Sequence, residues 1–277
     1  MAQRAWFITG VSSGLGREMT RQLLERGDQV AGTVRDLDSV TDLTKKYRDR
    51  FWSAHLDVTD TGEIRKVVDA AFSALGTIDV VVNNAGYGLF GAAEELTDDQ
   101  VVHQIWTNLL GSIQVVRSAL PHLRRQQQGR IVQISTFGGQ AALPGASLYH
   151  ASKWGIEGFA EALMPELAPF NIGVTIIEPG GARTRFRHGS AQLGPVMPAY
   201  NDTPASVIRR IFEDGNNVPP GDPAKMAAII IDSVDVTPAP KRIVLGSDSY
   251  AILVNALTQR LADIETQKDL AASTDFA

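Results

Sequence analysis

Cysteine is absent from the 277 residues of this chain. Disulfide bonds, thiolate catalysis and cysteine-ligated metals are therefore excluded. Long apolar runs are also lacking, since nowhere do 18 or more apolar residues follow one another, and the first residues show no signal-peptide pattern. We expect a cytoplasmic protein with no membrane partner.

An excess of positive charge is lacking too, because 26 lysines and arginines stand against 31 aspartates and glutamates, for a formal net charge of -5. This balance argues against a nucleic-acid surface and favours a small neutral or polar ligand. The five histidines show no pair at metal-ligand spacing, so no metal is expected. We interpret four as structural and only the fifth as a residue that could touch substrate; they are His55, His103, His122 and His150, and then His188.

Short apolar runs separated by helical patterns make up most of the chain. The runs are Ala5–Thr9, Gln29–Val34, Phe51–Leu56, Ile78–Val82, Arg130–Ile134, Gly173–Ile177 and Arg242–Leu245. Runs this apolar predict strands buried on both faces of a parallel sheet. The predicted fold class is α/β, a single doubly wound Rossmann-type domain over residues 1–277 with a seven-stranded parallel sheet and helices on both faces. Ligands bind such sheets at the carboxyl ends of the strands, where the strand order reverses.

One long segment departs from this alternation. Residues 185–222 are rich in glycine and proline, and only Pro204–Phe212 has a helical pattern. A long irregular segment inside a compact domain is more often a functional lid than mere slack. We therefore predict a substrate lid there, and an amphipathic helix over Ser247–Lys268 near the end of the chain.

A glycine-rich turn follows the first predicted strand and opens a helix. Its sequence is Thr9-Gly10-Val11-Ser12-Ser13-Gly14-Leu15-Gly16. Glycines let the backbone turn tightly and approach a pyrophosphate, and the free N–H groups at a helix start favour the anion. The turn is not a P-loop, because no Gly-Lys-Ser/Thr follows it. In this α/β context it predicts a dinucleotide site, although a glycine turn alone is often only a strand-to-helix connection.

The end of the second predicted strand indicates which dinucleotide binds. An NAD site usually places an acid there for the ribose 2′-hydroxyl, whereas a nearby arginine accommodates a 2′-phosphate. Here Val34 stands at the acid position and Arg35 follows it. We predict that NADP(H) is preferred over NAD(H). The alternative is that Arg35 is a solvated residue and that Asp36 only caps the next helix.

Tyr149 and Lys153 lie one helical turn apart, in the predicted helix after the fifth strand. This spacing puts a phenol beside an ammonium on one helix face, although such a pair is usually only a surface contact. Two hydroxyl residues, Ser135 and Thr136, end the preceding strand. Together these groups suggest a proton-donating site. An ordinary phenol is a poor proton shuttle at neutral pH, so we expect Lys153 to lower the pKa of Tyr149.

Six short motifs, in order over residues 5–185, resemble those of the short-chain dehydrogenase/reductase family. They are Thr9 to Gly16 (T-G-x-x-x-G-x-G), Asp57 after the third strand, Asn83-Asn84-Ala85-Gly86, Asn108, Tyr149-x-x-x-Lys153, and Pro179 to Thr184 (P-G-x-x-x-T). Each motif alone is weak, but six in the family's order and spacing are strong. The cofactor-binding residues implied by the resemblance and by Arg35 are Thr9, Gly10, Ser12, Ser13, Gly14, Leu15, Gly16, Arg35, Asp57, Asn84, Ala85, Gly86, Tyr149, Lys153, Pro179, Gly180 and Thr184.

The resemblance also implies catalytic roles. Tyr149 would be the general acid in reduction and the general base in oxidation, supported by Lys153, while Asn108 would hold a water that links Lys153 to solvent. The family usually has a catalytic serine thirteen residues before the tyrosine, and here that position is Thr136. We assign the role to Thr136 and keep Ser135, one residue earlier, as the alternative.

Apolar residues dominate the segments from which substrate specificity should come. They are Leu89, Phe90, Leu143, Pro144, Phe186, Leu193, Val196, Met197 and Tyr200. We predict an oxidoreductase that transfers hydride between NADP(H) and a small apolar ketone or secondary alcohol. Two alternatives remain open, a non-catalytic NADP(H) sensor and an epimerase or dehydratase on the same scaffold. The helices predicted over residues 98–127 and 151–169 resemble those through which family members pair, which implies a homodimer or homotetramer.

Overall fold

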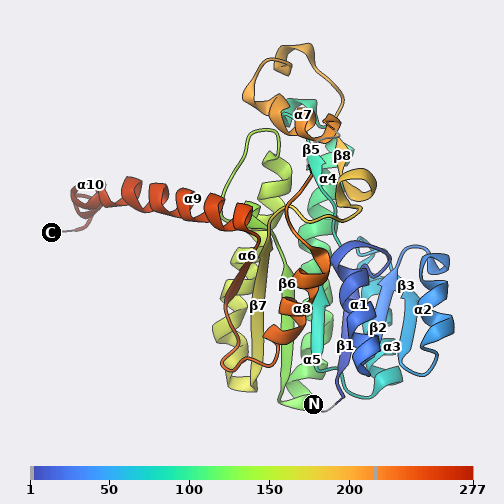
Figure 1. The fold of residues 1–277 in the computed structure, drawn as a ribbon. Helices are drawn as coiled ribbons and strands as arrows, with labels where there is room; N and C mark the ends of the chain where they lie inside the picture. Colours follow the sequence, from blue (N-terminus) through green and yellow to red (C-terminus); the bar gives the residue numbers. More distant parts are fainter. Residues whose placement is uncertain (1–2, 215–217, 277) are drawn as a thin grey trace.

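The computed structural model describes residues 3–214 and 218–276, and for residues 187 and 188 it describes the backbone alone. Seven parallel strands form one sheet in the order β3-β2-β1-β4-β6-β7-β9 (Figure 1). Their bounds are β1 Ala5–Thr9, β2 Gln29–Val34, β3 Phe51–His55, β4 Val80–Asn83, β6 Gly129–Ile134, β7 Ile172–Pro179 and β9 Arg242–Leu245. The predicted α/β fold class with a seven-stranded parallel sheet is confirmed.

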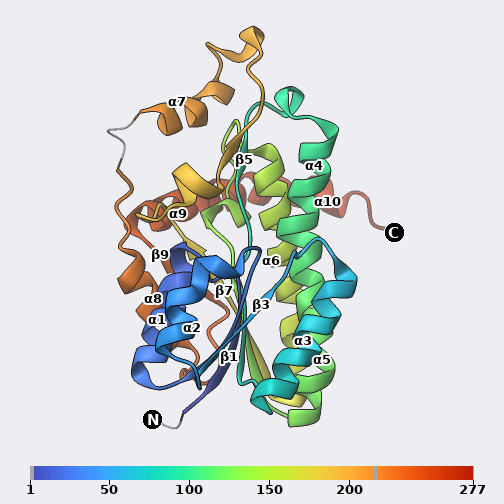
Figure 2. The same ribbon diagram turned by 90° about the vertical axis from the view of Figure 1, so that its right-hand side faces the viewer.

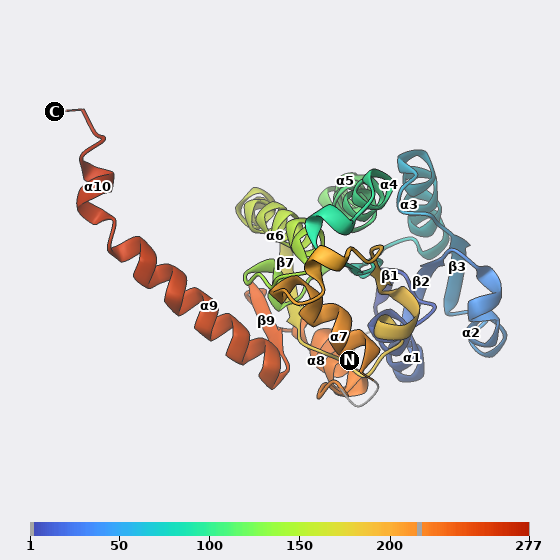
Figure 3. The same ribbon diagram turned by 90° about the horizontal axis from the view of Figure 1, so that it is seen from above.

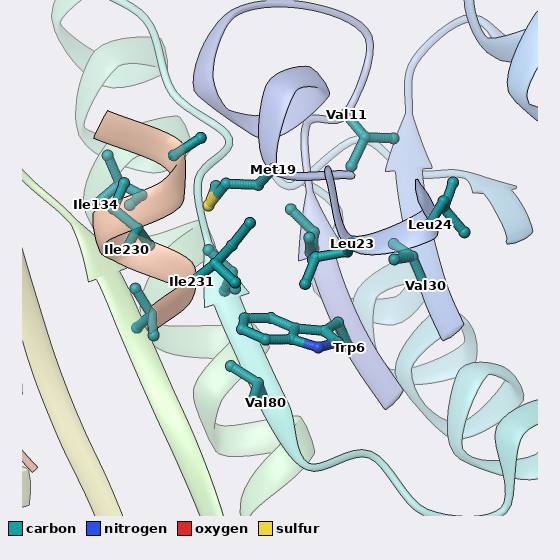
Figure 4. Packing of buried hydrophobic residues seen from close by; sticks show 14 of the residues in the cluster. Trp6, Val11, Met19, Leu23, Leu24, Val30, Val80, Ile134, Ile230 and Ile231 are labelled. Carbon is teal, nitrogen blue, oxygen red and sulfur yellow. The ribbon is translucent and has the colours of Figure 1, made fainter. Parts of the chain in front are cut away.

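Helices cover both faces of the sheet, as Figures 1 and 2 show. One face carries α1 Gly14–Arg26, α2 Thr41–Lys46 and α8 Pro223–Ser233, and the other carries α3 Thr61–Leu75, α5 Gly111–Gln126 and α6 Ser147–Leu167. Figure 4 shows the apolar core beneath α1, α2 and α8, in which Met19 and Leu23 of α1 and Ile230 of α8 pack against side chains of the strands. Because the inner strands are covered on both faces, their side chains are apolar on both, which explains the continuous apolar runs, whereas the edge strands β3 and β9 are only partly buried.

The helix predicted over residues 98–127 is interrupted. It consists of α4 Asp98–Ile105, the π-helical turn η3 Trp106–Leu110, and α5. The side-chain amide of Asn108, inside η3, donates to the carbonyl of Tyr87 at 2.7 Å and accepts from its N–H at 3.0 Å. Single π-turns inside α-helices often mark functional sites. Here the turn fastens the helix to the segment that follows β4.

Strand order reverses between β1 and β4, because the chain first runs outward through β2 and β3 and then returns to pair β4 with β1. The loops after β1 and β4 consequently diverge to opposite sides and leave a crevice at the carboxyl ends. The glycine-rich turn of residues 9–16 and the Asn84-Ala85-Gly86 segment both lie there.

The predicted lid lies beyond the carboxyl ends of the strands (Figures 1 and 2). It contains a short strand, β8 Gln192–Leu193, which pairs in parallel with β5 Leu89–Phe90. The helical turn η8 Pro204–Ser206 and helix α7 Val207–Glu213 replace the predicted helix Pro204–Phe212. Residues 215–217 of the predicted lid lie outside the described part. The segment is thus more ordered than its glycine and proline content indicates, because β5 supplies backbone partners.

The last helices, α9 Ser247–Glu265 and α10 Lys268–Ala272, project away from the body (Figure 3). About midway along the arm, Arg260 touches the loop after β6: its guanidinium donates to the carbonyl of Gln140 at 2.6 Å and lies 4.6 Å from the ring centroid of Trp154. Among the described residues no helix is both long and apolar enough to cross a membrane.

Candidate active site

A cavity of about 480 Å³ opens at the carboxyl ends of the strands. It brings together most of the residues predicted to act on cofactor or substrate. Those that line it are Gly10, Ser12, Ser13, Gly14, Leu15, Arg35, Asp57, Asn84, Ala85, Gly86, Ser135, Thr136, Tyr149, Lys153, Pro179, Gly180 and Thr184. One cavity therefore joins the glycine turn to the Tyr/Lys pair, although these lie more than 130 residues apart in the chain.

Three predicted site residues stand behind the cavity wall. The hydroxyl of Thr9 accepts the N–H groups of Asn84 and Ala85, each at 3.0 Å. A Cβ on Gly16 would come within 2.3 Å of the Gly10 carbonyl oxygen, so glycine there lets α1 approach the turn. Asn108 holds Tyr87, as described above. These three residues shape the wall and do not line the cavity.

The glycine turn fits the pyrophosphate of a dinucleotide. Gly10 and Gly14 have φ values of +74° and +58°, which favour glycine. A Cβ on Gly10 would also meet the Cα of Ala85 at 3.1 Å. Ser13, the N-cap of α1, is extended and its side chain makes no capping bond within the described part of the chain, so it does not occupy the N–H groups at this helix start, whose residues Ser13, Gly14 and Leu15 line the cavity. Such a start binds anions.

Two charged residues mark the far end of the cavity. Arg35 lines it and is exposed to solvent. Asp57 lines it as well, and although burial opposes ionisation, hydrogen bonds from the N–H and hydroxyl of Thr59 hold the pKa of its carboxyl below the ordinary value. The Asp57 carboxylate is therefore fixed by its neighbour and available to a polar group such as an adenine amine.

The Tyr/Lys pair lies in the opposite half of the cavity. The phenol of the half-buried Tyr149 is enclosed by the rings of Phe90 and Phe186, whose centroids lie 5.3 and 6.3 Å from its own. Lys153 is buried, lies 5.8 Å from the Tyr149 ring centroid and donates to the carbonyl of Ile134 at 3.1 Å. The phenol and the ammonium thus share one enclosed space.

The expected lowering of the Tyr149 pKa by Lys153 is not found. Burial raises the pKa of Tyr149 above its ordinary value, because a phenolate there would lose its hydration. Burial also lowers the pKa of Lys153 to about 8, against the opposing influence of the Glu157 carboxylate. At neutral pH the site therefore holds a protonated phenol beside a lysine that is still charged, which is the arrangement a proton donor needs.

The Lys153 pKa predicts a pH dependence. Lys153 is charged below about pH 8 and neutral above it, so ketone reduction should fall as the pH rises past 8, by up to tenfold per pH unit. The measurement is kcat/KM for a ketone from pH 6 to 10 at saturating NADPH. In Lys153→Arg the fall should move beyond this range even if the overall rate is lower. A wild-type profile that stays flat to pH 10 would contradict the assignment.

The two hydroxyls at the end of β6 have different partners. Thr136 donates to the carbonyl of Pro179 at 3.1 Å, across the top of the sheet beside the family's P-G motif. Ser135 donates to the buried carboxylate of Glu157. Both hydroxyl hydrogens have acceptors, but a bond to a carboxylate is stronger than one to a neutral carbonyl, so the Thr136 hydroxyl is the easier of the two to turn toward a substrate oxygen. This difference favours Thr136 over Ser135 for the contact with substrate.

Sequence analysis missed a buried ionic cluster beneath this loop. Arg242 of β9 makes ion pairs with Glu157 of α6 and Glu178 of β7, and Glu178 accepts a hydrogen bond from Gln140. Burial raises the pKa of Glu157 in spite of its hydrogen bonds to Ser135 and Arg242. The signal available in the sequence was Glu157, an acid one turn beyond Lys153 and between the apolar residues Ile156 and Ala160 of the same helix.

The substrate end of the cavity is aromatic. Of the predicted apolar residues Phe90, Leu143 and Phe186 line it, while Leu89 is buried beneath and the remaining five do not reach it. Ile208 and Phe212 of α7 take their place, and the Phe212 ring lies 4.9 Å from that of Phe90. Two histidines that we interpreted as structural, His103 and His150, also line the cavity. The side chain of His188 lies outside the described residues.

A buried ion pair fastens the lid over this end. Both oxygens of the Glu95 carboxylate are used: they accept the N–H groups of Ala92 and Met197 at 2.8 and 3.0 Å, and one also pairs with Arg209 at 3.2 Å. These hydrogen bonds outweigh burial and keep the pKa of Glu95 below its ordinary value. Arg209 lies on α7 between Ile208 and Phe212, so the pair fixes the helix that supplies the aromatic wall.

Glu95→Ala should lower the free energy of unfolding by about 3 kcal/mol, because it leaves the Arg209 charge buried without its partner. It should also raise KM for the ketone more than it lowers kcat, since the proton-donating groups are untouched. The matched control is Glu94→Ala, which removes only the exposed bond to the Tyr200 hydroxyl. Denaturant unfolding and steady-state kinetics measure both effects. Equal behaviour of the two variants would contradict a role for the pair.

Comparisons with known proteins identify the family of this chain. A family model described as short chain dehydrogenase matches residues 4–192. Oxidoreductase BOA17 of Botryotinia fuckeliana is 34% identical over 273 residues, which is 98% of this chain and 99% of that protein. A short-chain dehydrogenase of Streptomyces avermitilis, known from its crystal structure, is 36% identical and matches with a TM-score of 0.92 over 98% of this chain and 100% of its own.

A solved actinorhodin polyketide ketoreductase with NADPH is 28% identical, with a TM-score of 0.71 over 88% of this chain and 97% of its own. More distant structures of the same fold hold NAD in one case and NADP in another. The family match, the curated relative and the solved structure all indicate the same family. The chain belongs to the short-chain dehydrogenase family and is an oxidoreductase of that family, acting on CH–OH groups.

Proposed function

We propose that the protein is an NADP(H)-dependent oxidoreductase that interconverts an apolar ketone and a secondary alcohol. The observation that carries the proposal is the single cavity in which Tyr149 and Lys153 meet the glycine turn. When bound, the dinucleotide supplies or accepts the hydride. The protein's part is to hold the substrate oxygen and to move a proton to it or from it.

The side chains divide this work. Thr136 positions the substrate oxygen, and Tyr149 gives its proton to that oxygen in reduction and takes it back in oxidation. Lys153 stabilises the phenolate that forms, because its ammonium is held nearby by the Ile134 carbonyl. Asn108 holds the Tyr87 segment beside Lys153 and is proposed to bind the water through which the proton is replaced. A Cβ on Gly86 would meet the Asn108 side-chain oxygen at 3.1 Å, so glycine leaves room there.

Preference for NADP(H) over NAD(H) rests on Arg35, which lines the adenosine end of the cavity next to Val34. An arginine can make two charge-assisted bonds to a phosphate, whereas a 2′-hydroxyl would favour an acid at this strand end. The ketoreductase noted above was solved with NADPH. That likeness supports the same choice here.

Arg35→Ala should weaken NADPH binding about 10- to 100-fold, because charged hydrogen bonds contribute about 1.5–3 kcal/mol. NADH affinity should change less than about twofold. Fluorescence titration of both cofactors against wild type and variant measures this, with Arg48→Ala, an arginine that does not line the cavity, as control. Wild-type binding that is tighter for NADH than for NADPH would overturn the preference.

An apolar substrate is proposed from the ring-lined end formed by Phe90, Phe186 and Phe212. The test is the loss of NADPH absorbance with ketones graded from small aliphatic to bulky aromatic, and we expect the bulky apolar ketones to react fastest. A sensor would bind NADPH and oxidise it with none of them. An epimerase or dehydratase would convert its substrate without net NADPH loss. A cytoplasmic location, a single domain and self-association remain predictions from the sequence.

A further inference from the structure

The arm formed by α9 and α10 exposes a row of large apolar side chains. Figures 1 and 3 show the arm leaving the body and running into solvent. Five residues of α9 make up the row, which we call the α9 stripe: Tyr250, Val254, Leu257, Leu261 and Ile264, each between 41% and 64% exposed. From residue 261 to residue 276 every residue is exposed, so the second half of the arm packs against nothing in the described part of the chain.

The spacing of the α9 stripe is regular. Successive members are four, three, four and three residues apart. That alternation is the heptad pattern with which one α-helix packs against another, side chains of each fitting between those of its partner. A membrane-surface helix or a general sticky patch needs a broad apolar face but not this narrow seam. The stripe therefore fits an α-helix of the same periodicity.

The arm also needs support to stay helical. Beyond Arg260 the arm consists of the last turn of α9 and the short helix α10. An isolated helix shorter than about 12–15 residues has only marginal stability in water. The hydrogen bonds of the side chains beyond Leu261 reach only residues of the arm itself. A partner helix along the stripe would supply the missing apolar contacts.

We propose that the α9 stripe pairs with the α9 stripe of a second copy of this chain. A two-fold axis makes one surface its own partner, so a stripe with uniform heptad spacing is complementary to itself. Five half-exposed large side chains offer on the order of 400–500 Å² of apolar surface per copy. A standard interface buries about 800 Å² per partner, a little over half of it apolar. The stripe thus meets the need of a stable dimer.

This contact differs from the one implied by the family resemblance, which uses the helices over residues 98–127 and 151–169. Within the described residues, those two ranges expose only three large apolar side chains, and these are scattered: Val102 of α4, Trp106 of η3, and Trp154 of α6, which Arg260 partly covers. The α9 stripe is therefore the better apolar surface. The inference stands apart from the proposed reaction, because none of its residues lines the cavity.

Sedimentation analysis of the full chain tests the proposal. Wild type should be a dimer. Leu257→Glu and Leu261→Glu should each raise its dissociation constant about 100-fold or more, because two-fold symmetry places one new carboxylate from each copy in the interface. The control Asn255→Glu adds the same charge off the stripe and should leave the dimer intact. Circular dichroism and NADPH binding, unchanged in all three variants, would show that they are folded.

The lack of cysteine permits a second test. Single substitutions to cysteine at the five stripe positions, oxidised without any other thiol present, should give a disulfide-linked dimer at one position or more, whereas Asn255→Cys should give none. A wild-type monomer, or a dimer that survives both Leu257→Glu and Leu261→Glu, would overturn the proposal. So would a monomer that binds phosphatidylcholine/phosphatidylserine vesicles through the stripe, because the occupant would then be a lipid surface.

Discussion

Tyr149→Phe should lower kcat for ketone reduction by about 10³-fold or more while NADPH binds as tightly as before. General acid catalysis contributes about 10²–10⁴-fold, and the variant removes the one hydroxyl that gives up the proton. The ring remains, so its packing against Phe90 and Phe186 is kept. Steady-state kinetics and fluorescence titration of NADPH measure the two quantities.

Tyr87→Phe is the matched control, since it removes another cavity-lining phenol whose hydroxyl bonds to His103 at 3.0 Å. It should retain most of the turnover. If Tyr149→Phe kept more than about a tenth of the wild-type rate, Tyr149 would not be the proton donor. If it lost NADPH binding together with turnover, the residue would act through cofactor affinity instead.

Thr136→Val should reduce kcat/KM by roughly 10²-fold, more than Ser135→Ala does. Valine keeps the branched shape of threonine but removes the hydroxyl that would hold the substrate oxygen. Removing one partner of such a hydrogen bond lowers transition-state stabilisation by about 1–3 kcal/mol or more. Ser135 instead donates to Glu157. Its loss should appear mainly as reduced stability.

Thr136→Ser separates hydroxyl chemistry from shape, and we expect it to keep most of the activity because serine is the family's usual residue here. Thermal unfolding of Ser135→Ala and Thr136→Val would show which hydroxyl supports the fold. The reverse ranking, with Ser135→Ala the less active enzyme and Thr136→Val nearly normal, would give the substrate contact to Ser135.

Much of this structure could be predicted because its causes are local in sequence. The strands could be predicted from apolar runs alone, and β1, β2 and β9 have the predicted bounds. β4 starts at Val80, two residues later than predicted, directly after Asp79, whose carboxylate accepts the N–H of Ala5 seventy-four residues away. The motif residues of the cavity were predictable because each carries a backbone or chemical requirement of its own.

The remainder depends on pairs of residues that no local pattern joins. In the sequence Arg209 looks like an ordinary residue of a surface helix, and only the folded chain brings it to Glu95. Arg242 belongs to an ionic cluster only because β9 lies beside β7. The lid residues were misplaced for the same reason: irregular segments carry no periodicity that says which side chain turns inward. The pKa of Tyr149 was misjudged because spacing revealed the nearby cation but not the depth of burial.

The contact between Arg260 and Gln140 has a practical consequence for anyone preparing the protein. The arm leads directly to the loop that follows Thr136, through a 2.6 Å hydrogen bond and the stacked Trp154 ring. A tag fused behind α10 would extend the arm that contacts this loop, whereas one placed before β1 lies at the amino ends of the strands, at the opposite end of the sheet from the cavity (Figure 1). Purification handles, immobilisation anchors and fusion partners are therefore best attached at the N-terminus.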